Sequence, residues 1–178
     1  MSSLTIDKLK FKAVKIKEYG IGFIQVKLSE DQVMNFYTDQ IPKFSNVESP
    51  HNHQRHFKSQ VLHGTIYENV YQVDQNGDQV AYCGCGNTDK EINSKFSILG
   101  NYNKIYKAND IYFRNKSIFH SVYADNDTVT LVTKMGKDKH DAIILSDKIE
   151  HMESKLTIEE LWDIVENILK RNYVPDII

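Results

Sequence analysis

The sequence predicts a mostly β protein with helices flanking a central β region. Short runs of β-branched and aromatic residues, separated by turn residues, extend from about 46 to 146. A Ser/Thr-x-x-Glu/Gln pattern, which marks helix starts, occurs before this region at Ser29 and after it at Thr157. We therefore expect one domain over 1–178, with an N-terminal strand and helix arm (1–45), a β-barrel (46–146) and a C-terminal helix (147–178).

In the N-terminal arm, the run from Gly20 to Leu28 predicts a strand. The pattern at Ser29 precedes apolar residues at helical spacing, which predicts a helix over 29–42 (Val33, Phe36, Tyr37 and Ile41). The segment 9–17 alternates apolar residues with lysines and fits either a strand or a helix. Its lysines are typical of a solvated face.

Turn residues divide the β region into strands. Gly64 separates two strands between Ser59 and Val73, and Asn76-Gly77 predicts a hairpin turn because both residues tolerate positive φ. Asp125-Asn126-Asp127 predicts a turn into a half-buried strand over 128–133. After Thr157, one helix face is apolar, which favours packing on the sheet over the alternative of a dimer contact (Leu161, Trp162, Val165, Ile168 and Leu169).

Composition narrows the class of protein. The chain has 178 residues, of which 40% are hydrophobic and 26% charged, as in soluble globular proteins. A net charge of -2 argues against a general nucleic-acid binder. No apolar run approaches the ~18 residues that span a bilayer, and the N-terminus lacks a signal-peptide core. We expect a cytoplasmic monomer or homodimer with a small-molecule substrate and neither nucleic-acid nor membrane partners.

Two histidines, His51 and His53, are separated by one residue. Side chains two apart on an extended strand share a face, so both rings can reach one point, and imidazole suits Zn, Cu, Fe and Ni. His120, after a turn and a short strand, is a candidate third ligand. Two simpler explanations exist: the pair can arise by chance among 7 histidines, and His120 can be an ordinary partly buried residue.

Together these segments resemble the cupin superfamily. Cupins carry a first motif with His-x-His and a following glycine, and a second motif with a lone histidine after a turn. The resemblance covers about 48–135, and 50–64 is similar to a poorly characterised cupin group with His-x-His-x3-Phe-x-Ser-x-Val-Leu-x-Gly. It implies a double-stranded β-helix, the cupin jelly roll, and a metal site at His51, His53 and His120. It implies no substrate.

The chain departs from the cupin pattern at several positions. Many cupins place a glutamate ligand seven residues before the turn glycine, where this chain has Phe57. The resemblance thus implies a neutral three-histidine set, the ligand type of the thiol dioxygenases, with Fe(II) as the expected metal and Ni or Zn as alternatives. In the second motif, Asn109 replaces a glycine and Ala124 an asparagine. Asparagine tolerates the left-handed conformation, whereas alanine removes a polar group.

A substrate pocket is expected beside this metal. Phe57 and Val61 would form its apolar wall. Ser59, on the same strand face as Phe57, is expected to be a catalytic group that hydrogen-bonds a ligand; the alternative is that it merely lines the barrel. His56 lies on the opposite face of an ideal strand, but a bulge could turn it inward as a catalytic group. Tyr112 is placed in the pocket, although packing is the simplest role for every strand tyrosine.

Cys83 and Cys85 flank Gly84 on one predicted strand. A structural zinc site usually draws four ligands, and nothing near this pair completes one. Two free thiols packed as small apolar groups are the simpler interpretation. If their strand lines the barrel, the thiols face the pocket.

These features favour a non-haem Fe(II)-dependent dioxygenase acting on a small polar or sulfur-containing metabolite. The alternative is a non-redox cupin, either an isomerase or lyase or a small-molecule-binding protein without turnover. Fold alone does not decide between them.

Overall fold

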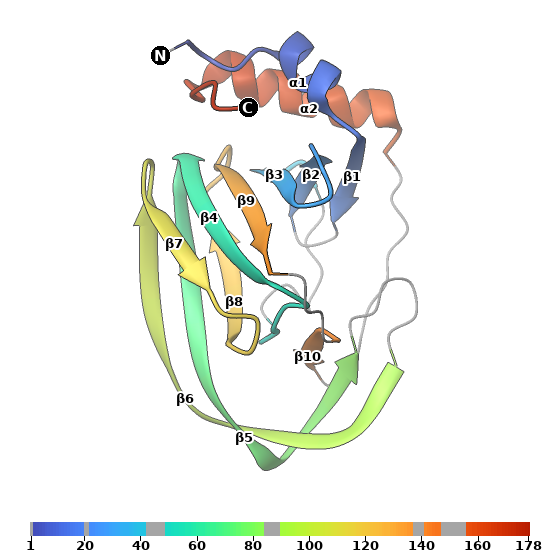
Figure 1. Cartoon of the computed structure of the whole chain (residues 1–178), viewed down its shortest axis with the longest axis vertical. Coiled ribbons are helices and arrows are strands. Elements are labelled where there is room, and N and C mark those ends of the chain that lie inside the picture. Colours follow the sequence, from blue (N-terminus) through green and yellow to red (C-terminus); the bar gives the residue numbers. More distant parts are fainter. Residues whose placement is uncertain (1, 20–21, 42–48, 84–89, 137–140, 147–155) are drawn as a thin grey trace.

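The computed structural model describes residues 2–19, 22–41, 49–83, 90–136, 141–146 and 156–178 (Figure 1), of which 79–80, 82–83 and 90–94 are described by their backbone alone. The elements in the described residues are α1 (Ile6–Lys12), β1 (Lys15–Tyr19), β2 (Phe23–Lys27), β3 (Gln32–Tyr37), β4 (His56–His63), β5 (Thr65–Cys83), β6 (Lys90–Lys107), β7 (Ile111–Arg114), β8 (Phe119–Ala124), β9 (Val129–Met135), β10 (Ile143–Leu145) and α2 (Ile158–Arg171). The mostly β prediction with flanking helices is confirmed.

The strands form two antiparallel sheets. The six-stranded sheet has the order β1-β2-β3-β9-β4-β7, and the four-stranded sheet has the order β10-β5-β6 with β8 also paired to β5. Figure 1 shows the long strands β5 and β6 curving around the end of the molecule opposite the two helices. The arrangement is consistent with a β-sandwich, and the strands of the described residues do not close into a barrel. The jelly-roll topology remains a prediction.

Helix α2 begins as the sequence predicts. The Thr157 hydroxyl accepts a hydrogen bond from the Glu160 amide at 3.2 Å, and the Glu160 carboxylate accepts one from the Thr157 amide at 2.7 Å. Its apolar face packs into the main core together with the buried Leu9 of α1 (Leu161, Ile164, Val165, Ile168 and Leu169). The expected packing on the sheet is therefore confirmed. Neither helix of the described residues is long and apolar enough to cross a membrane.

The predicted helix over 29–42 is wrong, because Gln32–Tyr37 is strand β3 between β2 and β9. The Ser29 hydroxyl accepts from the amides of Asp31 and Gln32, at 3.2 and 3.0 Å, and so stabilises the turn between β2 and β3. A serine that accepts from amides two and three residues ahead suits a turn as well as a helix start. The ambiguous segment 9–17 divides between the end of α1 and the start of β1.

The β region follows the predicted turns with one exception. Gly64, at φ 79°, separates β4 from β5, and Asp127, at φ 65°, lies in the turn before β9. Asn109 adopts positive φ (78°), as its place in the second motif requires. The hairpin predicted at Asn76-Gly77 is wrong: residues 75–78 form a bulge within β5, because Asp74 pairs with Ser97 and Gln79 with Phe96.

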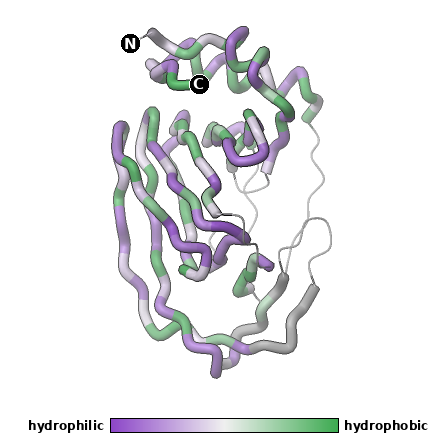
Figure 2. The backbone as a smooth tube through the Cα atoms, viewed as in Figure 1, coloured by the Kyte–Doolittle hydropathy of each residue, from purple (hydrophilic) through white to green (hydrophobic). Residues whose placement is uncertain are grey.

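The six-stranded sheet presents two different faces. One face packs on the helices through apolar residues of β2, β3 and β9 (Ile24, Val26, Met34, Phe36 and Leu131). The intervening residues point the other way and combine polar side chains with apolar ones (Gln25, Asn35 and Thr130 beside Phe23, Val33 and Val132). Figure 2 shows hydrophobic and hydrophilic residues alternating along the strands. This second face, which we call the polar face, lines the cavity beside the candidate site.

Candidate metal centre

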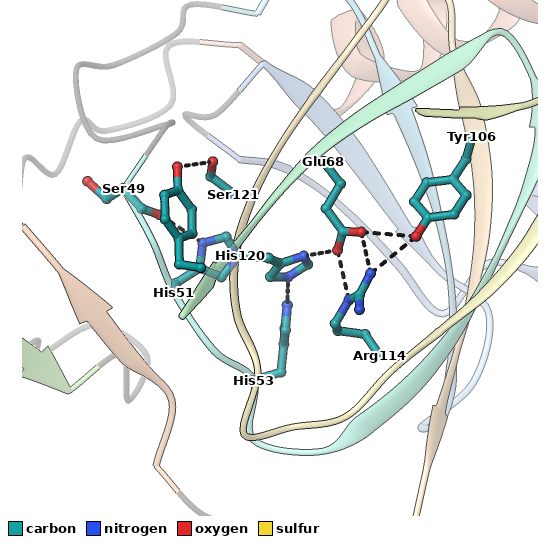
Figure 3. Close-up of polar contacts among 9 residues, drawn as sticks. Ser49, His51, His53, Glu68, Tyr106, Arg114, His120 and Ser121 are labelled. Atoms are coloured by element: carbon teal, nitrogen blue, oxygen red, sulfur yellow. Dashed lines mark hydrogen bonds and ion pairs between the residues drawn. The ribbon is translucent and has the colours of Figure 1, made fainter. Parts of the chain in front are cut away.

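The three predicted histidines converge. One ring nitrogen from each of His51, His53 and His120 lies within 4.8 Å of the other two. The ring centroids are 4.9 to 5.1 Å apart, so the rings form a nearly equilateral triangle (Figure 3). His120 is buried, and the other two rings are partly buried. Three imidazoles gathered in this way could hold a metal ion.

His51 lies on a short extended segment between β8 and β10. Its amide donates to the His120 carbonyl at 2.9 Å, and its carbonyl accepts from the His120 amide at 2.8 Å. On the other side, Asn52 donates its amide to Ile143 at 3.0 Å and accepts from the Ile143 amide at 2.7 Å. A single bridge rather than a regular strand therefore brings His51 beside His120.

Two of the three rings have their tautomer set by a neighbouring acceptor. His120 Nδ1 lies 2.5 Å from a Glu68 carboxylate oxygen, and His51 Nδ1 lies 3.1 Å from the Ser49 carbonyl (Figure 3). Both partner oxygens accept, so each Nδ1 donates its hydrogen. In the neutral ring, Nε2 then carries the lone pair that a metal needs, as in carboxylate–histidine–metal arrangements.

The third ring, His53, contacts His120 through Nε2 at 2.6 Å. Because Nε2 of His120 is an acceptor, the hydrogen between the two atoms belongs to His53. Two nitrogens bound tetrahedrally to one ion at about 2.1 Å lie about 3.4 Å apart. Metal binding through His53 Nε2 therefore requires its hydrogen to move to Nδ1, which gives the other neutral tautomer, and requires a separation of the two rings by about 0.8 Å. The donor set fits a divalent transition metal.

Burial keeps the rings of His51 and His53 neutral. It lowers the pKa of His51 from 6.5 to about 4, with a further contribution from the charge of His120. Burial also places the pKa of His53 well below its usual value, and the neighbouring His51 and His120 add to this effect. Neutral imidazole is the form that binds metal, so both rings are in that form at neutral pH.

A buried carboxylate, Glu68, supports His120 from behind. Glu68 is 1% exposed and accepts from Arg114 Nε at 2.8 Å, from Arg114 Nη2, and from the Tyr106 hydroxyl at 3.2 Å. Burial raises the Glu68 pKa, but the hydrogen bond and charge of His120 and the charge of Arg114 outweigh it, so the pKa is lowered overall. Glu68 is thus an ionised acceptor whose charge Arg114 balances.

Sequence reasoning missed Glu68. The signal was available, since Ile66, Glu68 and Val70 alternate on one face of β5 and all three are buried. An acidic residue in an otherwise apolar alternation needs a buried partner. Nothing local identified Arg114 as that partner, because it lies 46 residues further along the chain.

Phe57, at the position where many cupins have a glutamate ligand, is a buried ring beside the histidines. Its centroid lies 4.7 Å from that of His53, at an interplanar angle of 75°. It is 7% exposed and offers no donor atom. The structure therefore agrees with a site built from three histidines without this carboxylate.

A cavity of about 490 Å³ opens beside the histidines. Its wall is the polar face of the six-stranded sheet, and it includes the predicted pocket residues Phe57, Ser59 and Tyr112. Burial raises the pKa of the Tyr112 hydroxyl, so that hydroxyl stays protonated. Val61 is fully buried and is not part of the cavity wall.

The other predicted site residues lie elsewhere. His56 accepts a hydrogen bond from the Lys116 amide at 3.2 Å, stacks on Phe113 at 6.0 Å and does not line the cavity. Cys83 is described by its backbone alone, which pairs with Ile143, and Cys85 lies outside the described residues. Catalytic roles for His56 and Ser59, and a pocket role for the two cysteines, stay predictions.

The cavity wall also contains residues that sequence reasoning did not single out. The described lining residues include three cationic side chains, Lys27, Arg55 and Lys134, and one carboxylate, Glu30. The buried hydroxyls of Ser59 and Thr130 have no hydrogen-bond partner of normal geometry within the described part of the chain. The Ser59 hydroxyl does, however, lie close to the Tyr112 hydroxyl. This contact lowers the Tyr112 pKa, but burial raises that pKa by more.

Comparison of the chain with protein-family models and with curated proteins finds no match. The resemblance to cupins therefore rests on the motifs, on the antiparallel β architecture and on the three-histidine geometry.

Proposed function

We propose that the chain binds one divalent transition metal at His51, His53 and His120 and, with Fe(II), oxidises a small organic anion as a dioxygenase. The observation that carries this proposal is the convergence of the three rings, two of which donate from Nδ1 and so carry the lone pair on Nε2. Fe(II) at such a centre would supply O2 chemistry, and three neutral ligands would leave its charge for an anionic substrate to balance.

The remaining residues have definite parts in this proposal. Glu68 holds His120 in one orientation and tautomer, and Arg114 balances the buried charge of Glu68. Phe57 covers His53 with an apolar surface, which keeps water from that side. Dioxygenation adds both atoms of O2 to the substrate, whose four-electron oxidation reduces the O2, so no separate reductant is needed.

The first test is metal content by elemental analysis of protein purified without a histidine tag. We expect about one divalent metal per chain, and alanine at His51, His53 or His120 should remove it. His56→Ala is the matched control, because His56 follows His53 by only three residues but does not line the cavity. A triple variant that keeps the wild-type metal content would place the site elsewhere.

The second test is O2 uptake by Fe(II)-reconstituted protein in the presence of small thiols and carboxylates. We expect uptake only with a molecule that also changes the metal spectrum under anaerobic conditions. Uptake that survives His120→Ala would exclude this centre as its source. Spectral changes without uptake would favour the alternative of ligand binding or non-redox chemistry.

A further inference from the structure

Three uncharged polar side chains lie next to one another in the cavity wall. Gln25, Asn35 and Thr130 all line the cavity, on β2, β3 and β9. The register pairs Gln25 with Asn35, and Asn35 with Thr130. Directly paired residues of antiparallel strands share a face, and their Cβ atoms are about 5 Å apart. The three side chains therefore form one continuous group, which we call the polar row.

The polar row is buried and only partly satisfied. Asn35 is 7% exposed and Thr130 is 1% exposed. Gln25 Nε2 donates to Asn35 Oδ1 at 3.0 Å, and this hydrogen bond fixes the two amides relative to each other. The Thr130 hydroxyl has no hydrogen-bond partner within the described part of the chain. Because buried polar groups are nearly always satisfied, a polar row that lines a cavity favours a polar ligand.

The surroundings of the polar row are uncharged on the side of Tyr37. This tyrosine follows Asn35 by two residues on β3 and also lines the cavity. Burial raises the pKa of the Tyr37 hydroxyl, and the hydrogen bond with Asn35 is the effect that opposes it. A cation close to this hydroxyl would lower its pKa as well, and none of the described cations does so. A carboxylate buried here would lack a counter-charge, which is costly, whereas an uncharged polar group would not.

The polar row lies away from the histidines but in the same cavity. Thr130 pairs with Val61 of β4, which follows Phe57 by four residues. Phe57 packs on His53. Four residues of an antiparallel strand span about 14 Å, so different parts of one ligand must reach the two places. A cavity of about 490 Å³ is large enough for an extended ligand of this kind.

We propose that the polar row binds an uncharged hydrogen-bonding group, such as a carboxamide, at the far end of a substrate whose anionic end reaches the three histidines. This inference rests on the proposed function for the anionic end and narrows the substrate class to organic anions with an uncharged polar tail. A carboxamide has one acceptor oxygen and two donor hydrogens. It can therefore accept from the Thr130 hydroxyl and exchange hydrogen bonds with the amides of Gln25 and Asn35.

The test is isothermal titration of the Co(II)-loaded protein with three thiols: mercaptohexanamide, mercaptohexanoate and hexanethiol. They share the thiol that would bind the metal and differ in the tail, which is uncharged and polar, charged, or apolar. We expect the amide to bind at least about tenfold more tightly than either of the others. The acid binding as tightly as the amide, or more tightly, would overturn the inference.

Two variants test the polar row itself. Asn35→Leu has a similar volume without hydrogen-bonding groups and should reduce the preference for the amide over hexanethiol to about one. Gln25→Met should reduce the same preference, and it decides the question if Asn35→Leu does not fold by circular dichroism. The matched control is Gln60→Met, because Gln60 is a partly buried glutamine of β4 that does not line the cavity. A preference for the amide that survives in Gln25→Met, or that Gln60→Met removes equally, would overturn the inference.

Lys27→Met tests the alternative of an anion in this part of the cavity. Lys27 lines the wall two residues after Gln25, on the other side of the polar row from Tyr37. We expect the variant to keep the preference for the amide over hexanethiol. Loss of that preference would mean that Lys27, not the polar row, selects the tail.

Failure of the metal centre would be seen separately. If Co(II) does not bind, or if no thiolate-to-Co(II) absorption forms, the proposed function is wrong. Titration of the metal-free protein with hexanamide and hexanoate, followed by NMR, then still decides the subsite because these probes need no metal. Hexanamide should shift the side-chain amide signals of Gln25 and Asn35 at concentrations where hexanoate does not. Equal shifts with both probes, or none with either, would overturn the inference.

Discussion

The two faces of the six-stranded sheet differ in what they contribute. On the helix side, Ile24, Met34 and Phe36 are fully buried in a continuous apolar core. One residue along the same strands, Gln25 and Asn35 face the cavity. Because side chains alternate along a strand, a shift of one residue separates positions that stabilise the fold from positions that can bind a ligand.

The faces also differ in how completely their groups are satisfied. The apolar face gains from burial alone and needs no partners. On the cavity face, Gln25 donates to Asn35 at 3.0 Å, whereas the buried hydroxyl of Thr130 lacks a partner among the described residues. Substitutions on the first face should therefore change stability, and those on the second should mainly change binding.

The largest effect on stability is expected on the helix face. Phe36→Ala should lower the free energy of unfolding by about 3–5 kcal/mol, because it leaves a cavity in a core that two helices close. Urea denaturation measures this loss. Metal content per folded chain should stay at the wild-type value, since Phe36 does not line the cavity. A loss below about 1 kcal/mol would mean that the helices contribute little to the stability of the sheet.

A pH titration should distinguish the histidine cluster from the apolar face. The unfolded chain protonates His51 near 6.5, but the folded chain does so only near 4. Stability of the metal-free protein is therefore complete above about 6.5 and falls as the pH drops towards 4, by about 3 kcal/mol for His51 alone. His53 acts in the same direction.

Urea unfolding at several pH values in the presence of a chelator measures this slope. The same measurement on His51→Gln serves as the reference, because the other titrating groups contribute equally to both proteins. The free energy of unfolding of the variant should change less with pH. Identical profiles for the two proteins would show that the ring titrates normally in the folded state.

The three histidines of the candidate site were predictable because their signals are local. Two histidines at i, i+2 in an extended segment must point the same way, and the turn before the second motif placed His120 at a strand start. The supporting network was not predictable in this way. Its His120–Glu68 contact joins residues 52 apart and exists only because β5 pairs with β8.

The error at β3 has a different cause. Val33, Met34, Asn35 and Phe36 are all buried, because one side of the strand meets the helices and the other side meets the cavity. A strand that is buried on both faces has no clear period of two, and its apolar residues then fit helical spacing equally well. Because this strand also forms part of the cavity wall, its sequence lacks the alternation that would have predicted a strand.

An intermediate effect is expected at Glu68, on the cavity side. Glu68→Gln retains an acceptor for His120 Nδ1 but removes the charge that pairs with Arg114. Loss of such a supporting carboxylate typically weakens metal binding about 10- to 100-fold. Competition with a chelator of known Co(II) affinity measures the change. The control is Glu166→Gln, because Glu166 pairs with Lys170 on the solvent side of α2 and should not affect Co(II) affinity. An equal loss of Co(II) affinity in both variants would mean that the effect is not transmitted through His120.

The smallest effect on stability is expected at Thr130, and a neighbouring threonine provides a sharp control. The Thr130 hydroxyl is buried without a partner among the described residues, so Thr130→Val should leave the free energy of unfolding unchanged or raise it by up to about 1 kcal/mol. Thr128 is equally buried, but its hydroxyl accepts from the Thr65 amide at 3.1 Å and donates to the Thr65 carbonyl at 3.2 Å. Thr128→Val should therefore cost about 1–3 kcal/mol, because it leaves the Thr65 amide without its acceptor. Urea denaturation of both variants without ligand compares the two residues directly. A loss at Thr130 as large as that at Thr128 would show that the Thr130 hydroxyl is already satisfied inside the protein, and that the cavity face has no unfilled position for a ligand at this point.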